Sequence, residues 1–135
     1  LLTDYLQEIS LYTDMDNDLS NEQRVKLMTI HSSKGLEFPY VFLCGFNEGV
    51  LPSSRSLNDR GKKAMEEERR LAYVAITRAE KGFFMTESEG YNFRTGLEKY
   101  PSRFLFEINE KFYVSKGKLD PKLIRDAKDF YKNLP

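Results

Sequence analysis

Residues 25–43 read VKLMTIHSSKGLEFPYVFL, and this stretch decides the fold class that the sequence predicts. Its beginning, residues 25–30, is a mostly apolar run that is typical of a β-strand. Residues 40–44 form a second apolar run, suited to a strand that is covered on both faces, and Pro39 is tolerated where a strand begins. Residues 31–37 lie between the two runs and predict a turn that enters a short helix.

The rest of the chain continues this alternation of strands and helices. Residues 66–76 are strongly helical, with Leu71, Val74 and Ala75 on one side, and residues 82–87 predict a third strand. The other expectations are an amphipathic helix over residues 2–13, loops over 14–21 and 47–61, irregular structure over 90–100, a short helix over 103–108 capped by Ser102, and a polar helix over 120–133 capped by Asp120. Such an alternation is the pattern of an α/β fold with a parallel sheet and crossover helices.

Ligands of such sheets bind beyond the carboxyl ends of the strands. Thr29, His31 and residues 34–37 follow the first expected strand, and residues 45–49 follow the second. We therefore expect these residues to lie together on one rim of the sheet.

Composition limits the class of protein. The 135 residues include 21 Lys and Arg and 21 Asp and Glu, so the net charge is about zero. This balance argues against a broad basic surface for duplex DNA, although a narrow single-strand channel stays compatible with it. The single cysteine, Cys44, fits a reducing compartment; residues 40–46 are too short to span a bilayer, and no signal peptide is recognisable. We expect a cytoplasmic protein without membrane contact, and a piece of a longer chain.

Residues 29–37 contain the first side chains that could carry chemistry. Thr29 and His31 can donate hydrogen bonds to phosphate oxygens or stack against a base. Gly35 allows a close approach of the backbone to a ligand, and Glu37 can accept two hydrogen bonds from a ribose diol. A plain strand-to-helix turn explains each of these residues taken singly, so the functional interpretation depends on their combination.

Arg78 is the second candidate. It follows the apolar face of the predicted helix and stands between the small residues Thr77 and Ala79. A guanidinium in this place could reach a phosphate that a neighbouring domain presents, and an arginine finger of this kind raises phosphoryl-transfer rates by roughly 10³–10⁵-fold. Solvent-exposed ion pairs, such as Glu66 with Arg69, account for Glu66, Glu67 and Arg69.

Residues 25–43 resemble motif V of the UvrD/Rep/PcrA family of superfamily-one DNA helicases, and residues 66–81, EEERRLAYVAITRAEK, resemble motif VI. Residues 47–52 and 101–105 also look like this family, so the resemblance extends from about residue 24 to residue 108. It implies the second RecA-like motor domain of an ATP-dependent helicase that moves 3′ to 5′ on single-stranded DNA. The implied α/β fold is a RecA-like parallel sheet with flanking helices, which is part of a P-loop NTPase-type fold without the P-loop.

The motif roles of the family apply to five positions of this sequence. The resemblance implies single-stranded DNA contacts for Thr29 and His31. It implies nucleotide contacts for Gly35 and for Glu37, with Glu37 on the ribose, and a catalytic contact of Arg78 with the γ-phosphate. It implies no metal ligand in this chain.

The resemblance also implies a domain organisation. Residues 1–20 would be a remnant helix and linker of an inserted accessory domain, residues 21–110 the C-terminal part of the second motor domain, and residues 111–135 a polar extension with a helix. No G-x-x-x-x-G-K-[S/T] loop occurs in the sequence. We therefore expect ATP and Mg²⁺ as cofactors of the intact parent protein and neither cofactor binding nor ATP turnover by this chain alone. The expected partners are single-stranded and duplex DNA, ATP and the first motor domain of the same parent chain.

Two alternatives stay open. The chain could belong to the motor of a helicase–nuclease subunit, although residues 68–79 favour the UvrD type. It could also be a non-enzymatic module that binds DNA or protein, although a net charge of about zero does not favour strong DNA binding by the chain alone.

Overall fold

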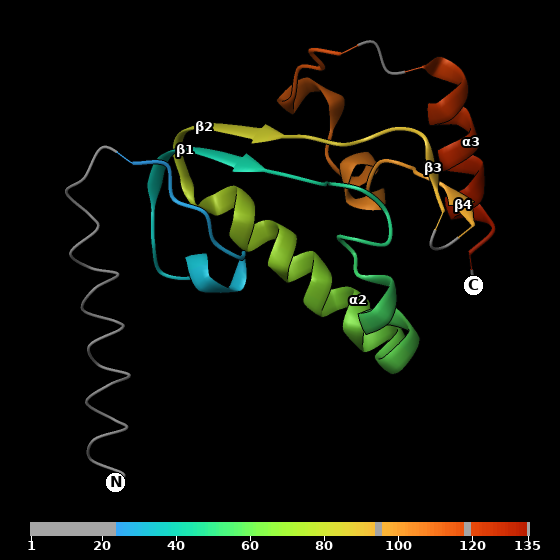
Figure 1. Cartoon of the computed structure of the whole chain (residues 1–135), viewed down its shortest axis with the longest axis horizontal. Coiled ribbons are helices and arrows are strands. Elements are labelled where there is room, and N and C mark those ends of the chain that lie inside the picture. Colours follow the sequence, from blue (N-terminus) through green and yellow to red (C-terminus); the bar gives the residue numbers. More distant parts are fainter. Residues whose placement is uncertain (1–23, 94–95, 118–119, 135) are drawn as a thin grey trace, which may run out of the picture.

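The computed structural model describes residues 24–93, 96–117 and 120–134, and the helix expected over residues 2–13 lies outside them. Two strands run above a long helix, and a small hairpin and a second helix lie at the far end of the molecule (Figure 1). In chain order the elements are η2 (His31–Ser33), β1 (Phe38–Leu43), α2 (Ser54–Thr77), β2 (Ala79–Met85), β3 (Tyr91–Asn92), β4 (Leu97–Glu98), η3 (Arg103–Glu107), η4 (Glu110–Phe112) and α3 (Pro121–Lys132).

The longer of the two described sheets is the parallel pair β1–β2. Tyr40 pairs with Gly82 and Phe42 with Phe84, and α2 is the helix that connects the two strands. Helix α2 runs along one side of the sheet (Figure 1). A parallel sheet with a crossover helix confirms the α/β class that the sequence predicts.

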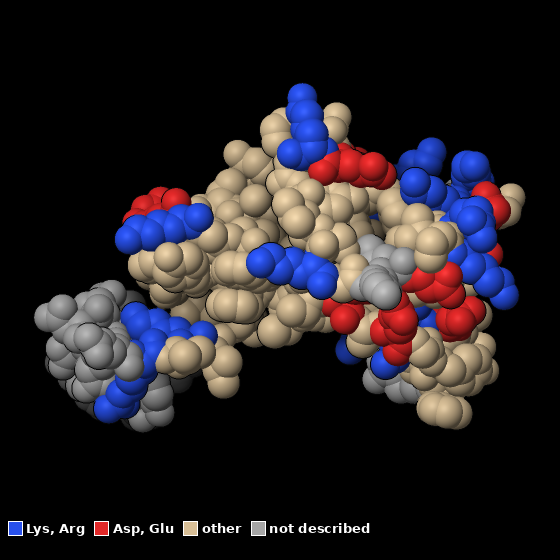
Figure 2. Space-filling model, turned by 90° about the horizontal axis from the view of Figure 1, so that it is seen from above, with Lys and Arg blue, Asp and Glu red and all other residues tan. Residues whose placement is uncertain are grey.

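The other face of the sheet is open, which corrects the expectation of a strand covered on both faces. Tyr40 and Phe42 are 60% and 65% exposed, and the Phe42 ring stacks on Phe84 with 4.7 Å between the ring centroids. Mostly uncharged residues occupy the middle of the molecule in Figure 2. The apolar composition of β1 predicts two covered faces, whereas the described chain leaves Tyr40 and Phe42 exposed.

Residues 25–30 do not form the predicted strand. Val25 and Leu27 are 92% and 94% exposed, and no strand of the described ranges pairs with this segment. A high β propensity means that a side chain fits a pleated, half-buried surface, and none of the described strands offers such a surface to these residues. Ile30 packs against the core. A short 3₁₀ helix, η2, does form within residues 31–37, but it precedes the turn instead of following it.

Helix α2 begins at Ser54, so the loop expected over residues 47–61 is too long. Ser53 caps the helix with its hydroxyl, which accepts from the Ser56 amide, and the Glu68 carboxylate accepts from the Ser53 amide at 3.0 Å. Gly61 marks a kink inside α2, with φ 55° and ψ −132°. Residue types that are typical of loops thus form a cap and a kink here.

The loop before α2 connects the sheet to the C-terminal part of the chain through hydrogen bonds. Asn47 is buried, and its side-chain amide donates to the carbonyls of Ser88 and Tyr100 at 2.9 and 3.2 Å. Glu48 accepts from the backbone and the guanidinium of Arg103. The main apolar cluster beneath this loop consists of Phe46, Leu51, Ala72, Phe104 and Leu105.

The C-terminal elements follow the sequence prediction in part. Ser102 and Asp120 cap η3 and α3 as expected, although η3 is a 3₁₀ helix. Strand β2 begins earlier than predicted, and the hairpin β3–β4 replaces part of the expected irregular stretch. Helix α3 packs on the rest of the chain through Leu123 and Ala127, which are buried. Within the ranges described above, no helix has both the length and the apolar character needed to cross a membrane.

Candidate functional site

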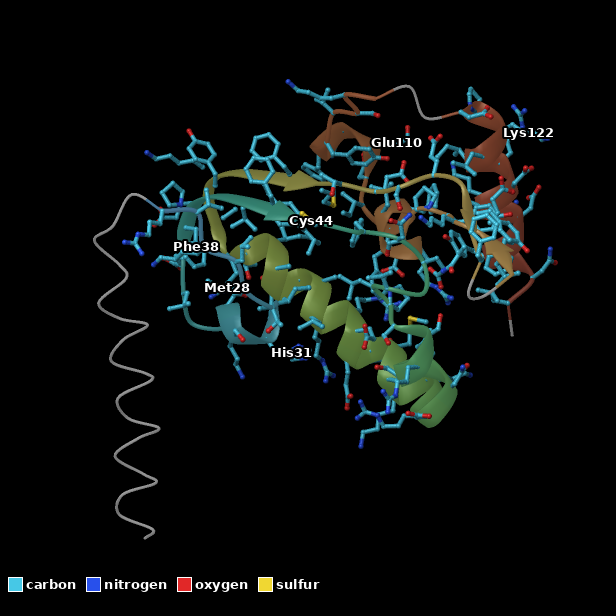
Figure 3. All side chains as sticks on the ribbon, viewed as in Figure 1. Met28, His31, Phe38, Cys44, Glu110 and Lys122 are labelled. Atoms are coloured by element: carbon cyan, nitrogen blue, oxygen red, sulfur yellow. The ribbon has the colours of Figure 1, made fainter. Side chains whose placement is uncertain are left out.

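The structure divides the predicted rim between the two ends of the sheet. Glu37 directly precedes β1 and Arg78 directly precedes β2, and because the strands are parallel both residues lie at the amino edge. Residues 45–49 follow β1 at the opposite edge; Phe38 and Cys44 mark the two ends in Figure 3. The expectation of one shared carboxyl-end rim is therefore wrong. The reason is that residues 31–37 lead the chain back to the beginning of β1.

Arg78 is the centre of the site at the amino edge. It is the C-cap residue of α2 and is half-buried. Its Nε donates to the Val74 carbonyl at 3.1 Å, its Nη1 to the Leu36 carbonyl at 2.9 Å and its Nη2 to the Thr77 hydroxyl at 3.1 Å. These bonds hold the guanidinium at the edge of the sheet, against the backbone of the residue that precedes Glu37. They keep it out of the apolar core.

No carboxylate pairs with Arg78 in the part of the chain that the structure describes. Its three acceptors are uncharged oxygens, whereas Arg69 pairs with Glu107 and Arg103 pairs with Glu48. Hydrogen bonding to Glu107 raises the pKa of Arg69, as expected for an internal ion pair. A guanidinium carries five N–H donors, so one donor on each terminal nitrogen of Arg78 stays available for an external oxyanion.

The turn before β1 contributes the acidic side chain of the site. Gly35 has φ +84°, and a Cβ there would meet no atom within 4 Å, so the backbone conformation and not crowding requires glycine. The turn directs the Leu36 carbonyl to Arg78. It leaves Glu37 exposed, with no hydrogen bond or ion pair of its carboxylate to any described residue. Glu37 and Arg78 therefore present two unpaired charges of opposite sign at one edge.

Thr29 and His31 lie at η2, before this turn. The Thr29 hydroxyl accepts from the Ser32 amide at 3.1 Å and lies 2.8 Å from the Ser32 hydroxyl, so it stabilises the start of η2. His31 is exposed and its ring makes no hydrogen bond to the residues described. Figure 3 shows His31 on the side of α2 that is remote from β1. The imidazole is thus open to a ligand, whereas the Thr29 hydroxyl already has a local role.

Two parts of this site carry no functional prediction from the sequence. The Thr77 hydroxyl donates to the Val74 carbonyl at 3.0 Å and accepts from Arg78. A threonine at the end of a helix commonly bonds back to such a carbonyl, and this rule could have identified it. The Leu36 carbonyl is a backbone group, so the identity of the side chain could not predict that it accepts a hydrogen bond from Arg78.

The predicted site residues lie at the surface of the described chain, because four of them are exposed and Arg78 is half-buried. A cavity of about 630 Å³ lies elsewhere, between the first half of α2, the β3–β4 hairpin and the end of α3, and none of the predicted site residues lines it. The described ranges also hold no cluster of three or more His, Cys, Asp or Glu residues that could bind a metal ion. A ligand at the amino edge would therefore need a second body to enclose it.

These observations define an α/β domain with unpaired charges at one edge of its parallel sheet, and comparison with known proteins identifies its family. The profile of the UvrD-like helicase C-terminal domain matches residues 1–90, and the chain belongs to this family.

Three relatives extend the match over most of the chain. The chain is 44% identical over 115 residues to a probable DNA helicase II homolog of Rickettsia conorii (strain ATCC VR-613 / Malish 7), which covers 82% of the chain and 17% of the relative. It is 44% identical over 110 residues to the ATP-dependent DNA helicase PcrA of Staphylococcus aureus (strain MRSA252), with 81% and 15% covered. It is 47% identical over 110 residues to PcrA of Leuconostoc citreum, with 80% and 14% covered. The chain thus spans less than a fifth of the length of these relatives.

Proposed function

We propose that this chain is the C-terminal part of an ATP-dependent 3′–5′ DNA helicase located in the cytoplasm. In this proposal residues 21–110 belong to the second RecA-like motor domain, residues 1–20 to an inserted accessory domain and residues 111–135 to a C-terminal extension. The family and the names of the relatives, DNA helicase II and PcrA, support it. ATP with Mg²⁺ binds at the first motor domain of the same parent protein, and the amino edge of the β1–β2 sheet faces that nucleotide.

The state of Arg78 is the observation that carries this proposal. During phosphoryl transfer, negative charge spreads over the oxygens of the γ-phosphoryl group, and the two unused donors of Arg78 can bond to two of them. No internal carboxylate has to be displaced first, because the three acceptors of Arg78 are neutral. Because these bonds already orient the side chain, little reorganisation is needed when the charge develops.

We assign the remaining roles to residues in and before the turn that connects η2 to β1. Glu37 accepts hydrogen bonds from the ribose hydroxyls of ATP, and Gly35 lets the backbone approach the nucleotide. His31 and Thr29, which are both exposed, contact single-stranded DNA. One short segment would then carry both the DNA contact and the nucleotide contact, which is what a motor needs in order to couple the two.

Substitution of Arg78 in the intact parent helicase tests the proposal. We expect Arg78→Ala to lower kcat for ATP by roughly 10³-fold or more, with a much smaller change in KM, because the interaction forms mainly in the transition state. Arg69→Ala is the matched control, since Arg69 lies on the same helix but is paired internally with Glu107. A kcat of Arg78→Ala close to that of the wild type would show the assignment to be wrong.

The chain alone should not hydrolyse ATP, because its sequence contains no G-x-x-x-x-G-K-[S/T] loop. ATP turnover by the purified chain that rises with single-stranded DNA would contradict this expectation. A salt titration with a single-stranded oligonucleotide tests the binding-module alternative. Micromolar or tighter, strongly salt-dependent binding by the chain alone would favour that alternative.

A further inference from the structure

Thr77 lies next to Arg78, and its hydroxyl faces the guanidinium. The hydroxyl is half-buried at the end of α2 and donates to the Val74 carbonyl at 3.0 Å. A hydroxyl has only one proton, so its bond with Arg78 Nη2, at 3.1 Å, must use an oxygen lone pair. Thr77 therefore acts toward Arg78 as a pure acceptor in a fixed direction.

The Val74 carbonyl completes this arrangement. It accepts from both the Thr77 hydroxyl and Arg78 Nε, so both of its lone pairs are in use. The three groups form a closed set of hydrogen bonds on one helical turn. Removal of the Thr77 hydroxyl would free Nη2 completely and leave the Val74 carbonyl with a single partner.

A third anchor comes from the turn before β1. Arg78 Nη1 donates to the Leu36 carbonyl at 2.9 Å, and the Leu36 amide donates to the Ser33 carbonyl at 3.0 Å. Ser33 is buried, and its amide in turn bonds to the Thr29 carbonyl at 3.2 Å. The backbone that follows Thr29 is therefore connected to the guanidinium through successive hydrogen bonds.

We propose that Thr77 is a positioning residue for Arg78, and that with the Leu36 carbonyl it clamps the guanidinium so that its two unused N–H donors point outward together. This inference rests on the proposed function of Arg78 and adds to it a reason for the orientation of the side chain. An unclamped arginine would sample several rotamers and would lose that entropy only on reaching the transition state. The clamp removes this loss in advance.

A simpler explanation is that Thr77 and Arg78 only terminate α2 by satisfying its last carbonyls. The two explanations differ in what they predict for enzyme kinetics. A cap contributes to stability, and its loss lowers every activity in proportion to the folded fraction. A positioning residue affects the transition state, and its loss lowers kcat while the affinities for ATP and DNA stay the same.

The experiment compares four variants of the intact parent helicase. Thr77→Val removes the hydroxyl at nearly constant shape, Thr77→Ser retains it, and Arg78→Ala tests the underlying function. Thr86→Val is the matched control, because Thr86 is exposed after β2 and no described hydrogen bond involves its hydroxyl. The readouts are kcat and KM for ATP, the affinity for a single-stranded oligonucleotide, and the midpoint of thermal unfolding.

We expect Thr77→Val to lower kcat about ten- to a hundredfold, the range that hydrogen bonds to charged groups span. KM, DNA affinity and the unfolding midpoint should stay near those of the wild type, and Thr77→Ser and Thr86→Val should be nearly fully active. A kcat of Thr77→Val within twofold of wild type, or an equal loss of all activities together with a lower unfolding midpoint, would overturn the inference. If Arg78→Ala itself keeps its turnover, the proposed function fails; if only Thr77→Val keeps it, the positioning role alone fails.

Discussion

Replacing Gly35 by alanine tests how the turn before β1 supports Arg78. Gly35 has φ +84°, and an added Cβ would meet no atom of the chain within 4 Å, so its effect on the fold comes from the backbone. Obstruction of the bound nucleotide by the added methyl group would instead raise KM for ATP. A left-handed conformation costs an alanine about 1–2 kcal/mol. If the turn keeps its shape, this strain lowers the free energy of unfolding by about that amount. If the turn relaxes instead, the Leu36 carbonyl moves away from Arg78, and the guanidinium loses one of its three anchors.

Gly90→Ala is the matched control for this change. Gly90 has φ +103° and equally open surroundings, but it directly precedes β3, at the opposite end of the molecule from the start of β2 (Figure 1). Both variants should show similar losses of stability in urea or thermal unfolding. Only Gly35→Ala should lower ATP turnover of the intact parent, by up to about tenfold, since 1.36 kcal/mol in the barrier corresponds to a factor of ten. Equal losses of turnover in the two variants, or none in Gly35→Ala, would refute this reasoning.

Three further predictions concern single side chains. Glu37→Gln should raise KM for ATP about tenfold or more with little change in kcat, because hydrogen bonds to a charged acceptor contribute about 1.5–3 kcal/mol; an unchanged KM would reject the ribose contact. His31→Ala should reduce the stimulation of ATP hydrolysis by single-stranded DNA and leave basal hydrolysis intact, and unaltered stimulation would reject the DNA contact. Burial, with a smaller contribution from Glu89, raises the pKa of Glu87, whose Oε2 is buried without a hydrogen-bond partner among the described residues. A carboxyl group whose folded pKa is raised destabilises the fold above that pKa and not below its unfolded pKa. Glu87→Gln should therefore raise the unfolding midpoint of the chain at about pH 7 but not below about pH 4, and an equal shift at both pH values would contradict this cause.

Local patterns of the sequence predicted the elements whose causes are themselves local. The cap and first turn of α3 follow from Asp120 and Pro121, whose chemistry acts within a few residues. The second half of α2 was predicted for the same reason. The first half was missed, because Gly61 is compatible with both a loop and a kinked helix, and the packing of the rest of the chain decides between them.

Strand prediction failed where the outcome depends on a neighbour. Residues 25–30 have the composition of a strand, but a strand exists only as part of a sheet, and no described strand lies beside them. The apolar side chains of β1 predicted a cover on both faces for the same reason, yet Tyr40 and Phe42 stay exposed. A sequence pattern indicates which side chains of a segment are suited to burial. It does not predict whether another part of the fold will cover them.

The sequence proposes candidate residues for the site, but it did not predict how they are arranged. Arg78 and Glu37 do lie at one edge of the sheet, but at the amino edge and not at the expected carboxyl edge. The direction in which residues 31–37 return to β1 depends on the tertiary path of the chain. The hydrogen bonds that clamp Arg78 could not be predicted from the sequence either, because two of the three acceptors are backbone carbonyls.

The most direct test of the central claim compares how Arg78 binds the ground state and the transition state of phosphoryl transfer. The affinities of the intact parent helicase for a non-hydrolysable ATP analogue and for ADP with aluminium fluoride should be measured with Arg78 and with Arg78→Ala, in the presence of single-stranded DNA. We expect Arg78→Ala to bind the ATP analogue nearly as well as the wild type but to bind the transition-state mimic more weakly by roughly 10³-fold or more. Equal weakening of both ligands, or of neither, would contradict it.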